Sequence, residues 1–318
     1  VSDRDGWAAD LYTAFTVLDI AASRQNICAV VAVIEQESGF QVDPVVHGLP
    51  TIAWREIDDR AARVGVPRVV VRGVLQLKSP DGRTYSERID RAQTEKELSD
   101  IFEDFIGTVP MGRTLFADKN PIRTRGPMQV HVAFAEQFAA SRPYPYPVKV
   151  SIGNEVFTRR GGVYFGVAHL LGYRAPYDSY LYRFADFNAG QYASRNAAFQ
   201  RALKRVTGLR LVADGALIAH DADPKSVGAT EQAARAAASR LRISESDVRG
   251  YLQQAKTAGF ANTVLYVRTF ELADRLERRA LPRAVVPDIV LAGPKISRQL
   301  TTAWYASRVD ARYHRCLK

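Results

Sequence analysis

The apolar segment at residues 27–34 constrains the fold more than any other feature of this chain. Every residue from Ile27 to Ile34 is apolar, which favours a helix buried on all sides over an amphipathic surface helix. Asn26 as an N-cap and Gly39 as the residue that ends the helix support this interpretation. A fully buried strand is the alternative, because periodicity alone does not separate the two in a short apolar run.

Glu37 falls in the last turn of this expected helix. The unpaired carbonyls and the negative end of the helix dipole disfavour a second negative charge there, and burial acts in the same direction. Both effects predict a raised pKa for the Glu37 carboxyl, as a general acid requires. A solvated carboxylate at a helix end is the alternative, because most Glu residues are exposed. Glu35 points about 200° away around the helix, and the helix alone does not decide which carboxylate faces a cleft.

Two later segments carry further candidate residues. Residues 125–130 read Arg-Gly-Pro-Met-Gln-Val, and apolar residues at 130, 134 and 138 recur every four positions. We therefore expect a helix with Pro127 in its first turn. Residues 184–190 read Phe-Ala-Asp-Phe-Asn-Ala-Gly.

Together with Glu37-Ser38-Gly39-Phe40, these segments resemble the lytic transglycosylases of the lysozyme superfamily. That family has a Glu-Ser pair at a helix end, then Gly-Leu-Met-Gln, then Ala-Tyr-Asn-Ala-Gly, in this order. The resemblance covers roughly residues 26–199. The chain is also similar to a family of Gram-negative lipoproteins thought to be related to these enzymes.

The resemblance implies a role for each matching residue. Glu37 matches the catalytic acid/base, and Ser38 matches the residue that orients the neighbouring substrate or carboxylate. Met128 matches the cleft wall, Gln129 a contact to the sugar N-acetyl group, and Asn188 a sugar-binding amide. Without the shared order of the motifs, Met128 would be read as core, Gln129 as surface and Asn188 as part of a turn.

Phe187 departs from the family pattern, because it stands where the family has a Tyr whose hydroxyl reaches toward the catalytic Glu. A hydroxyl from Tyr180, Tyr182 or Tyr192 could replace it from a neighbouring turn. Without a replacement, the chain fits a catalytically weak or inactive peptidoglycan-binding scaffold.

The implied reaction is cleavage of the β-1,4 bond between N-acetylmuramic acid and N-acetylglucosamine, with formation of a 1,6-anhydro end. Glu37 alone would serve as acid and base, and no cofactor is implied. Ordinary glycosidases use two carboxyl groups. If Asp43 or Asp186 lies across the cleft from Glu37, a muramidase-type hydrolase on the same fold is the better interpretation.

The charge and composition of the chain limit the classes of partner that it is expected to bind. The net charge of +10 suits the anionic cell-wall polymer and suits nucleic acid equally well. We find no nucleic-acid-binding motif, and the five His residues show no spacing typical of a metal site. We therefore expect peptidoglycan glycan strands as the partner, and neither nucleic acid nor a metal ion.

The resemblance implies a periplasmic lipoprotein, anchored to the outer membrane by an N-terminal lipid upstream of this chain. No apolar run approaches the roughly 18 residues of a membrane helix. In the periplasm, Cys28 and Cys316 could form a disulfide between the buried helix and the C-terminal tail. Two separate buried thiols fit the sequence equally well.

The expected fold is mainly α: a lysozyme-like helical domain with a large insertion after the catalytic helix and a helical C-terminal extension. Residues 1–40 and 125–208 would form the lysozyme-like domain, residues 41–124 the insert, and residues 209–318 the extension packed on the catalytic domain. A long insertion without structure of its own is uncommon in a compact domain. We therefore expect a folded insert that borders the sugar-binding cleft.

Overall fold

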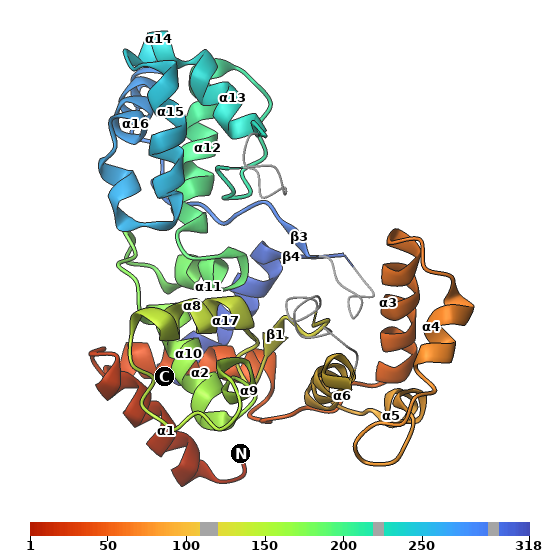
Figure 1. Ribbon diagram of the computed structural model, residues 1–318. Coiled ribbons are helices and arrows are strands. Elements are labelled where there is room, and N and C mark those ends of the chain that lie inside the picture. Colours follow the sequence, from red (N-terminus) through yellow and green to blue (C-terminus); the bar gives the residue numbers. More distant parts are fainter. Residues whose placement is uncertain (109–119, 219–225, 292–298) are drawn as a thin grey trace. The chain divides into compact units, whose positions relative to one another are not determined.

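The computed structural model describes residues 1–108, 120–218, 226–291 and 299–318 and is built almost wholly from helices (Figure 1). The prediction of a mainly α fold is confirmed. Within the described residues, the strands are two antiparallel pairs of two residues each. Among these residues, no helix has the length and apolar character needed to cross a membrane.

The chain divides into two compact units. Apart from residues that the structure does not describe, unit 1 comprises Val1–Asp19 and Ile34–Gly166. Unit 2 comprises Ile20–Val33, Val167–Ala292 and Arg298–Lys318. The helices at Arg24–Glu37 (α2) and Arg159–Leu171 (α10) contribute residues to both units. The lysozyme-like domain, the insert and the extension stay a prediction.

Unit 1 contains most of the expected insert and the hairpin that carries Met128 and Gln129. Beside its parts of α2 and α10, its elements are α1 (Arg4–Val17), α3 (Leu49–Arg63), α4 (Arg68–Val74), α5 (Tyr85–Arg91), α6 (Glu95–Thr108), β1 (Thr124–Arg125), β2 (Val130–His131), α8 (Val132–Ser141) and α9 (Ile152–Glu155).

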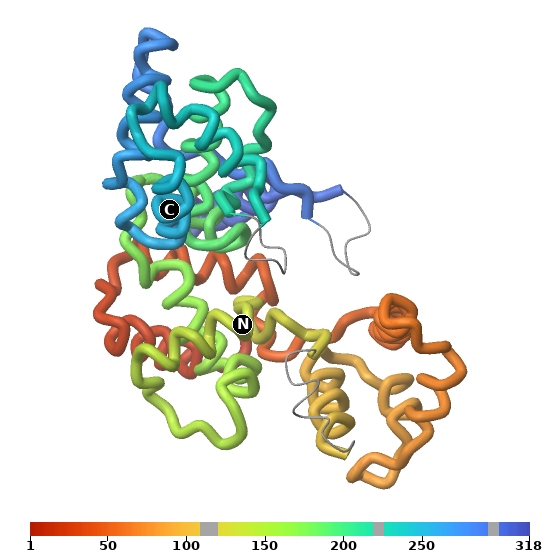
Figure 2. Tube along the Cα trace, turned by 45° about the horizontal axis from the view of Figure 1, so that its top comes forward, coloured from red at the N-terminus to blue at the C-terminus, as the bar shows by residue number. Residues whose placement is uncertain are grey.

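Helices α3 to α6 form a folded group with its own apolar core (Figure 2, orange). The core side chains come from all four helices or their ends and from two flanking positions: Leu49, Ala53, Leu75, Tyr85, Ile89, Ala92, Leu98, Ile101, Ile122 and Phe157. A capping box begins α6: the Thr94 hydroxyl accepts from the Glu97 N–H at 3.3 Å, and a Glu97 oxygen accepts from the Thr94 N–H at 3.2 Å. Helices α3 to α6, which lie in the range expected for the insert, therefore form a folded structure with its own core.

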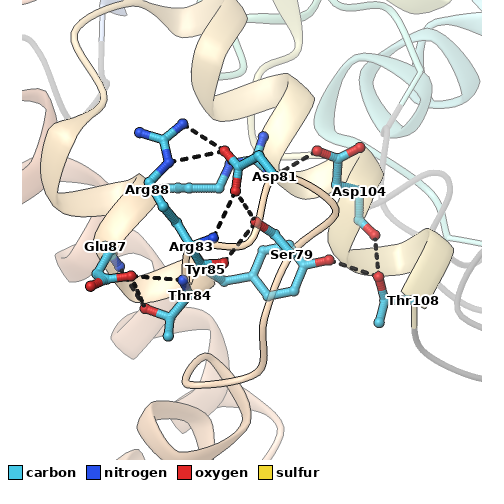
Figure 3. A network of polar contacts seen from close by, with 9 residues as sticks. All are labelled: Ser79, Asp81, Arg83, Thr84, Tyr85, Glu87, Arg88, Asp104 and Thr108. Atoms are coloured by element: carbon cyan, nitrogen blue, oxygen red, sulfur yellow. Dashed lines mark hydrogen bonds and ion pairs between the residues drawn. The ribbon is translucent and has the colours of Figure 1, made fainter.

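A polar network fixes the turn between α4 and α5 and joins it to α6 (Figure 3). Asp81 accepts from the Ser79 hydroxyl at 2.7 Å and from the Arg83 guanidinium at 2.6 Å. Arg88 donates to Asp104 on α6 at 2.6 Å, and the Tyr85 hydroxyl lies 2.7 Å from the Thr108 hydroxyl. These side chains tie neighbouring helices together and are satisfied within the insert.

Unit 2 contains a helical bundle and the segment 184–190, which carries Phe187 and Asn188. Beside its parts of α2 and α10, its elements are α11 (Tyr180–Ala189), α12 (Ala193–Thr207), α13 (Ala229–Ala236), α14 (Ala238–Leu241), α15 (Glu245–Leu252), the 3₁₀ turns η2 (Gln253–Lys256) and η3 (Ala258–Asn262), α16 (Val264–Glu277), β3 (Val290–Leu291), β4 (Leu300–Thr301) and α17 (Thr302–Cys316). Buried side chains of α12, α13, α15 and α16 form one apolar core.

A disulfide closes the chain within unit 2. Cys28 on α2 is bonded to Cys316 at the end of α17, with Cα atoms 5.5 Å apart and 288 positions between them in sequence. Because it spans such a long segment, this bond restricts the unfolded chain strongly.

Candidate functional site

Helix α2 has the predicted position but differs in two details. Most of its apolar side chains are buried, whereas Ile27 is 37% exposed and Val31 is half-buried, so the helix is not covered on all sides. Asn26 is not the N-cap: its N–H donates to the Ser23 hydroxyl at 3.2 Å, which makes Ser23 the capping side chain. The sequence offers both residues, and the helix begins at the earlier one.

Glu37 is the last residue of α2 and is half-buried. The Ser38 hydroxyl donates to the Ile34 carbonyl at 3.2 Å, and the Gly39 N–H donates to the same carbonyl at 3.1 Å. Gly39 has the predicted left-handed conformation, with φ 58°, and the Phe40 ring then packs edge-on against Trp7 at 5.3 Å. The Ser38 proton thus closes the helix end, and only the lone pairs of its oxygen can serve a substrate.

The Gly-Pro-Met-Gln segment is the turn of a hairpin, so the prediction of a helix starting at Pro127 is wrong. Thr124 pairs with His131 and Arg125 with Val130, and the Gln129 N–H donates to the Gly126 carbonyl at 3.0 Å. The following helix, α8, begins only at Val132. A helix start and a tight turn both accept Pro in this place, and strands of two residues are too short to give a periodic signal.

Glycines hold this turn against α10. Gly126 has φ 72°, and a Cβ there would overlap the Val156 carbonyl oxygen. Met128 is fully buried, and a Cβ at Gly166 on α10 would overlap its sulfur. The structure corrects the expectation that Met128 lines the cleft: its side chain supports the turn from the core side.

Gln129 is half-buried and held by three hydrogen bonds. Its side-chain nitrogen donates to a Glu95 carboxylate oxygen at 3.4 Å and to the Gly126 carbonyl at 3.3 Å, while the Thr124 hydroxyl donates to its oxygen at 3.0 Å. Glu95 and Gly126 offer only acceptors, so the amide nitrogen must face them. An amide oxygen can accept two hydrogen bonds. Because Thr124 occupies one lone pair of the Gln129 oxygen, the other remains for a donor on a ligand.

Glu95 is a candidate site residue that the sequence analysis missed. It is 9% exposed at the first position of α6, so the insert reaches the Gln129 turn directly. In the sequence, Glu95 is only an acidic residue that follows Thr94, and the helix dipole alone explains an acidic residue in the first turn of α6.

Asp43, a candidate second carboxylate, is engaged at the N-terminus of α6. It is bound by the Thr94 side chain and the Lys96 N–H, and burial raises the pKa of its carboxyl despite these donors. Its contacts explain it as a structural side chain that anchors the chain after α2 to the insert.

Asp186, the other candidate, is fully buried in unit 2. It accepts from the Tyr173 hydroxyl at 2.8 Å, from the Tyr177 hydroxyl, and from the N–H groups of Tyr192 at 3.0 Å and Ser194 at 2.6 Å. Burial raises its pKa to about 6, and the donors act in the opposite direction. Asp186 joins α11 to the start of α12 and has no access to a substrate.

Phe187 and Asn188 also lie in unit 2. Phe187 is 8% exposed and packs against the His169 ring, with ring centroids 4.9 Å apart. The Asn188 side chain is exposed, and its oxygen accepts from the Thr302 hydroxyl at 2.7 Å. Because the residue is exposed and this contact uses the oxygen, the amide nitrogen can donate to a ligand.

None of the three Tyr residues that could replace the missing hydroxyl is well placed for that role. The Tyr180 hydroxyl donates to Asn26 at 2.5 Å, and its ring stacks on Tyr313. Tyr192 is 4% exposed, beneath the Arg195 guanidinium. The Tyr182 ring packs edge-on against the Tyr177 ring, with centroids 5.4 Å apart.

If the chain cleaves glycan strands, as the family resemblance implies, replacing Phe187 by Tyr is expected to raise the rate of cleavage or leave it unchanged. The ring is nearly buried but touches the half-buried His169, so a hydroxyl can reach solvent at modest cost. Initial rates on peptidoglycan and thermal unfolding of both proteins test this. A large loss of stability would show that the ring end lies in a dry core and that the third motif is misaligned.

The described residues contain no cluster of three or more His, Cys, Asp or Glu side chains that could hold a metal ion.

A family model described as "Protein of unknown function (DUF1615)" matches residues 1–318. "Uncharacterized protein YaiW" of Escherichia coli (strain K12) is 50% identical over 318 residues, which cover 100% of this chain and 86% of that protein. No solved structure matches the chain.

Proposed function

We propose that this chain, which belongs to the DUF1615 family, is a peptidoglycan lytic transglycosylase with Glu37 as its general acid and base. The observation that supports the proposal is that one compact unit, unit 1, contains two features that match the family motifs. Glu37 ends a largely buried helix, and Gln129 projects an oriented amide oxygen from a turn braced by glycines. Both match the family motifs in kind and in order.

In the proposed reaction, the protonated Glu37 carboxyl gives its proton to the oxygen between N-acetylmuramic acid and N-acetylglucosamine. The N-acetyl group of the muramic acid supports the positive charge that develops at C1. The Glu37 carboxylate then removes the proton of the C6 hydroxyl, and the C6 oxygen bonds to C1. The products are a 1,6-anhydro end and a free N-acetylglucosamine end, and no water is consumed.

Hydrolysis on the same fold needs a second carboxylate with access to water. Both candidate carboxylates are occupied by donors of the protein. Asp43 is bound at the start of α6, and Asp186 is buried and accepts from the Tyr192 and Ser194 N–H groups. This supports the single-carboxyl reaction over the hydrolase. A catalytically inactive peptidoglycan-binding scaffold has one observation in its favour, which is the absence of a hydroxyl at Phe187.

We place the protein in the periplasm as an outer-membrane lipoprotein. The disulfide between Cys28 and Cys316 supports an oxidising compartment, because such bonds rarely persist in the cytosol. The lipid anchor comes from the family resemblance alone.

Incubation of the purified protein with intact peptidoglycan, followed by mass analysis of the products, tests the proposal. A transglycosylase gives anhydro-ended fragments, and a hydrolase gives fragments heavier by one water. Binding to the glycan without cleavage would leave the scaffold.

Replacing Glu95 by Ala is expected to raise the KM for glycan about 5- to 10-fold with little change in kcat, because Gln129 loses an acceptor that orients its amide. Glu95→Gln keeps an acceptor in the same place and should stay within about twofold of wild type. Asp100→Asn is the matched control, since Asp100 lies on the same helix and pairs with Lys96 at 2.6 Å. Equal KM values for Glu95→Ala and wild type would contradict the positioning role.

A further inference from the structure

The insert carries a basic and apolar surface, here called the α4 surface, which consists of residues 60–78. Helix α4 and its flanking residues expose six aliphatic side chains in this stretch: Val64 (75%), Val66 (38%), Val69 (76%), Val70 (50%), Val74 (38%) and Leu77 (50%). No residue of α4 itself is buried, and the helix lies beside α3 (Figure 1). Isolated exposed aliphatic residues are ordinary, whereas six of them within 14 consecutive positions, three on one short helix, mark a candidate interaction surface.

The side of α4 that faces the core of α3 to α6 is already packed. Val71 packs against the core of α3 to α6, and Leu75, just after the helix, belongs to that core. Val70 and Val74 lie one helical turn apart on the same face, with Val69 next to them. The exposed valines therefore form the outer face of a helix whose inner face is anchored.

The α4 surface carries an excess of positive charge. Residues 60–78 contain Arg60, Arg63, Arg68, Arg72 and Lys78 and no acidic residue, and the neighbouring acidic residues are Glu56, Asp58 and Asp59 on α3. Asp58 on α3 pairs with Arg68 and, at 3.2 Å, with Arg72, and Glu56 pairs with Arg60 at 2.7 Å. Arg63 and Lys78 have no such partner in the part of the chain that the structure describes, so the surface keeps a net positive charge.

We propose that the α4 surface docks on an anionic lipid bilayer. The valines would enter the boundary between headgroups and acyl chains, and Arg63 and Lys78 would bind the lipid phosphates. A hydrated glycan strand offers the charge complement but gives six aliphatic side chains nothing to bury, so lipid fits both properties of the surface. This docking does not depend on the catalytic proposal and adds a protein contact to any lipid anchor upstream.

Flotation of the purified 318-residue chain with vesicles tests the proposal. One set contains phosphatidylglycerol and phosphatidylethanolamine, and the other contains phosphatidylcholine alone. We expect binding to the anionic vesicles that weakens in high salt. The double variant Val69→Asp/Val70→Asp should bind at least about 10-fold more weakly, and Arg63→Gln/Lys78→Gln about 10-fold more weakly at low salt.

The matched control is Val150→Asp/Val212→Asp, which adds the same charge at two exposed valines outside the α4 surface (78% and 64% exposed) and should bind like wild type. Thermal unfolding checks that every variant is folded. The proposal is overturned if no vesicles are bound, if both vesicle types bind equally, or if Val69→Asp/Val70→Asp binds like wild type. A concentration-dependent dimer that this variant abolishes, without vesicle binding, would identify the surface as a protein contact and also overturn it.

Discussion

Replacing Glu37 by Gln is expected to lower the rate of peptidoglycan cleavage about 100- to 10,000-fold, the usual contribution of a general acid and base. The amide has nearly the same volume as the carboxyl but cannot give a proton to the glycosidic oxygen or take one from the C6 hydroxyl. Ser38 and Gly39 close the end of α2 through the Ile34 carbonyl, and Gln preserves the shape of the Glu37 side chain, so the fold should be little affected. Rates of anhydro-product formation and thermal unfolding measure the two effects.

Glu35→Gln is the matched control for this variant. Glu35 is also half-buried and lies two residues earlier on α2, pointing to a different side. It should keep most of the activity, while Glu37→Gln should still bind glycan strands close to wild-type affinity. Turnover by Glu37→Gln at the wild-type rate would remove Glu37 from the mechanism, and an equal loss in both variants would point to a disturbed helix end.

The elements that the sequence predicts best are those governed by local rules. The apolar run at 27–34 predicts a buried helix. Gly39 predicts the end of this helix, because glycine has no Cβ and adopts the left-handed conformation without steric cost. The capping box of Thr94 and Glu97 predicts the start of α6. Each of these depends only on residues a few positions apart.

The candidate site depends on contacts that local rules do not contain. The hydrogen bond from Gln129 to Glu95 joins residues 34 positions apart, and the turn conformation of Gln129, with φ 51°, requires the support of Gly126 against α9 and α10. The Gly-Pro-Met-Gln segment thus looks helical in sequence and forms a hairpin turn in the fold. Likewise, nothing in the sequence around Asp186 reveals that four donors converge on it.

Asp186 is also where the largest stability effect is expected. Removing its carboxylate by Asp186→Ala leaves the Tyr192 and Ser194 N–H groups and the Tyr173 hydroxyl without their acceptor in a dry interior. Buried donors without a partner are costly, and here several are created at once. We expect the free energy of unfolding to fall by about 3–5 kcal/mol at pH 5.

The loss should depend on pH in a defined direction. Burial raises the pKa of Asp186 from 3.8 to about 6, so the folded protein binds its proton more tightly than the unfolded chain. The raised pKa of Asp186 therefore contributes fully to the free energy of unfolding below about pH 4. This contribution is lost as the pH rises through about 6. The destabilisation by Asp186→Ala should therefore be about 1.5 kcal/mol smaller at pH 7.5 than at pH 5.

Denaturant unfolding of wild type and variant at both pH values measures this difference, with Asp178→Ala, at an exposed carboxylate of the preceding loop, as the control that should change little. A larger loss at pH 7.5 than at pH 5 would reverse the sign. It would mean that the two backbone N–H groups and the tyrosine hydroxyls hold Asp186 as an anion more strongly than burial opposes it. In that case the junction of α11 and α12 would be stabilised by the charge itself and would weaken as the carboxyl gains its proton.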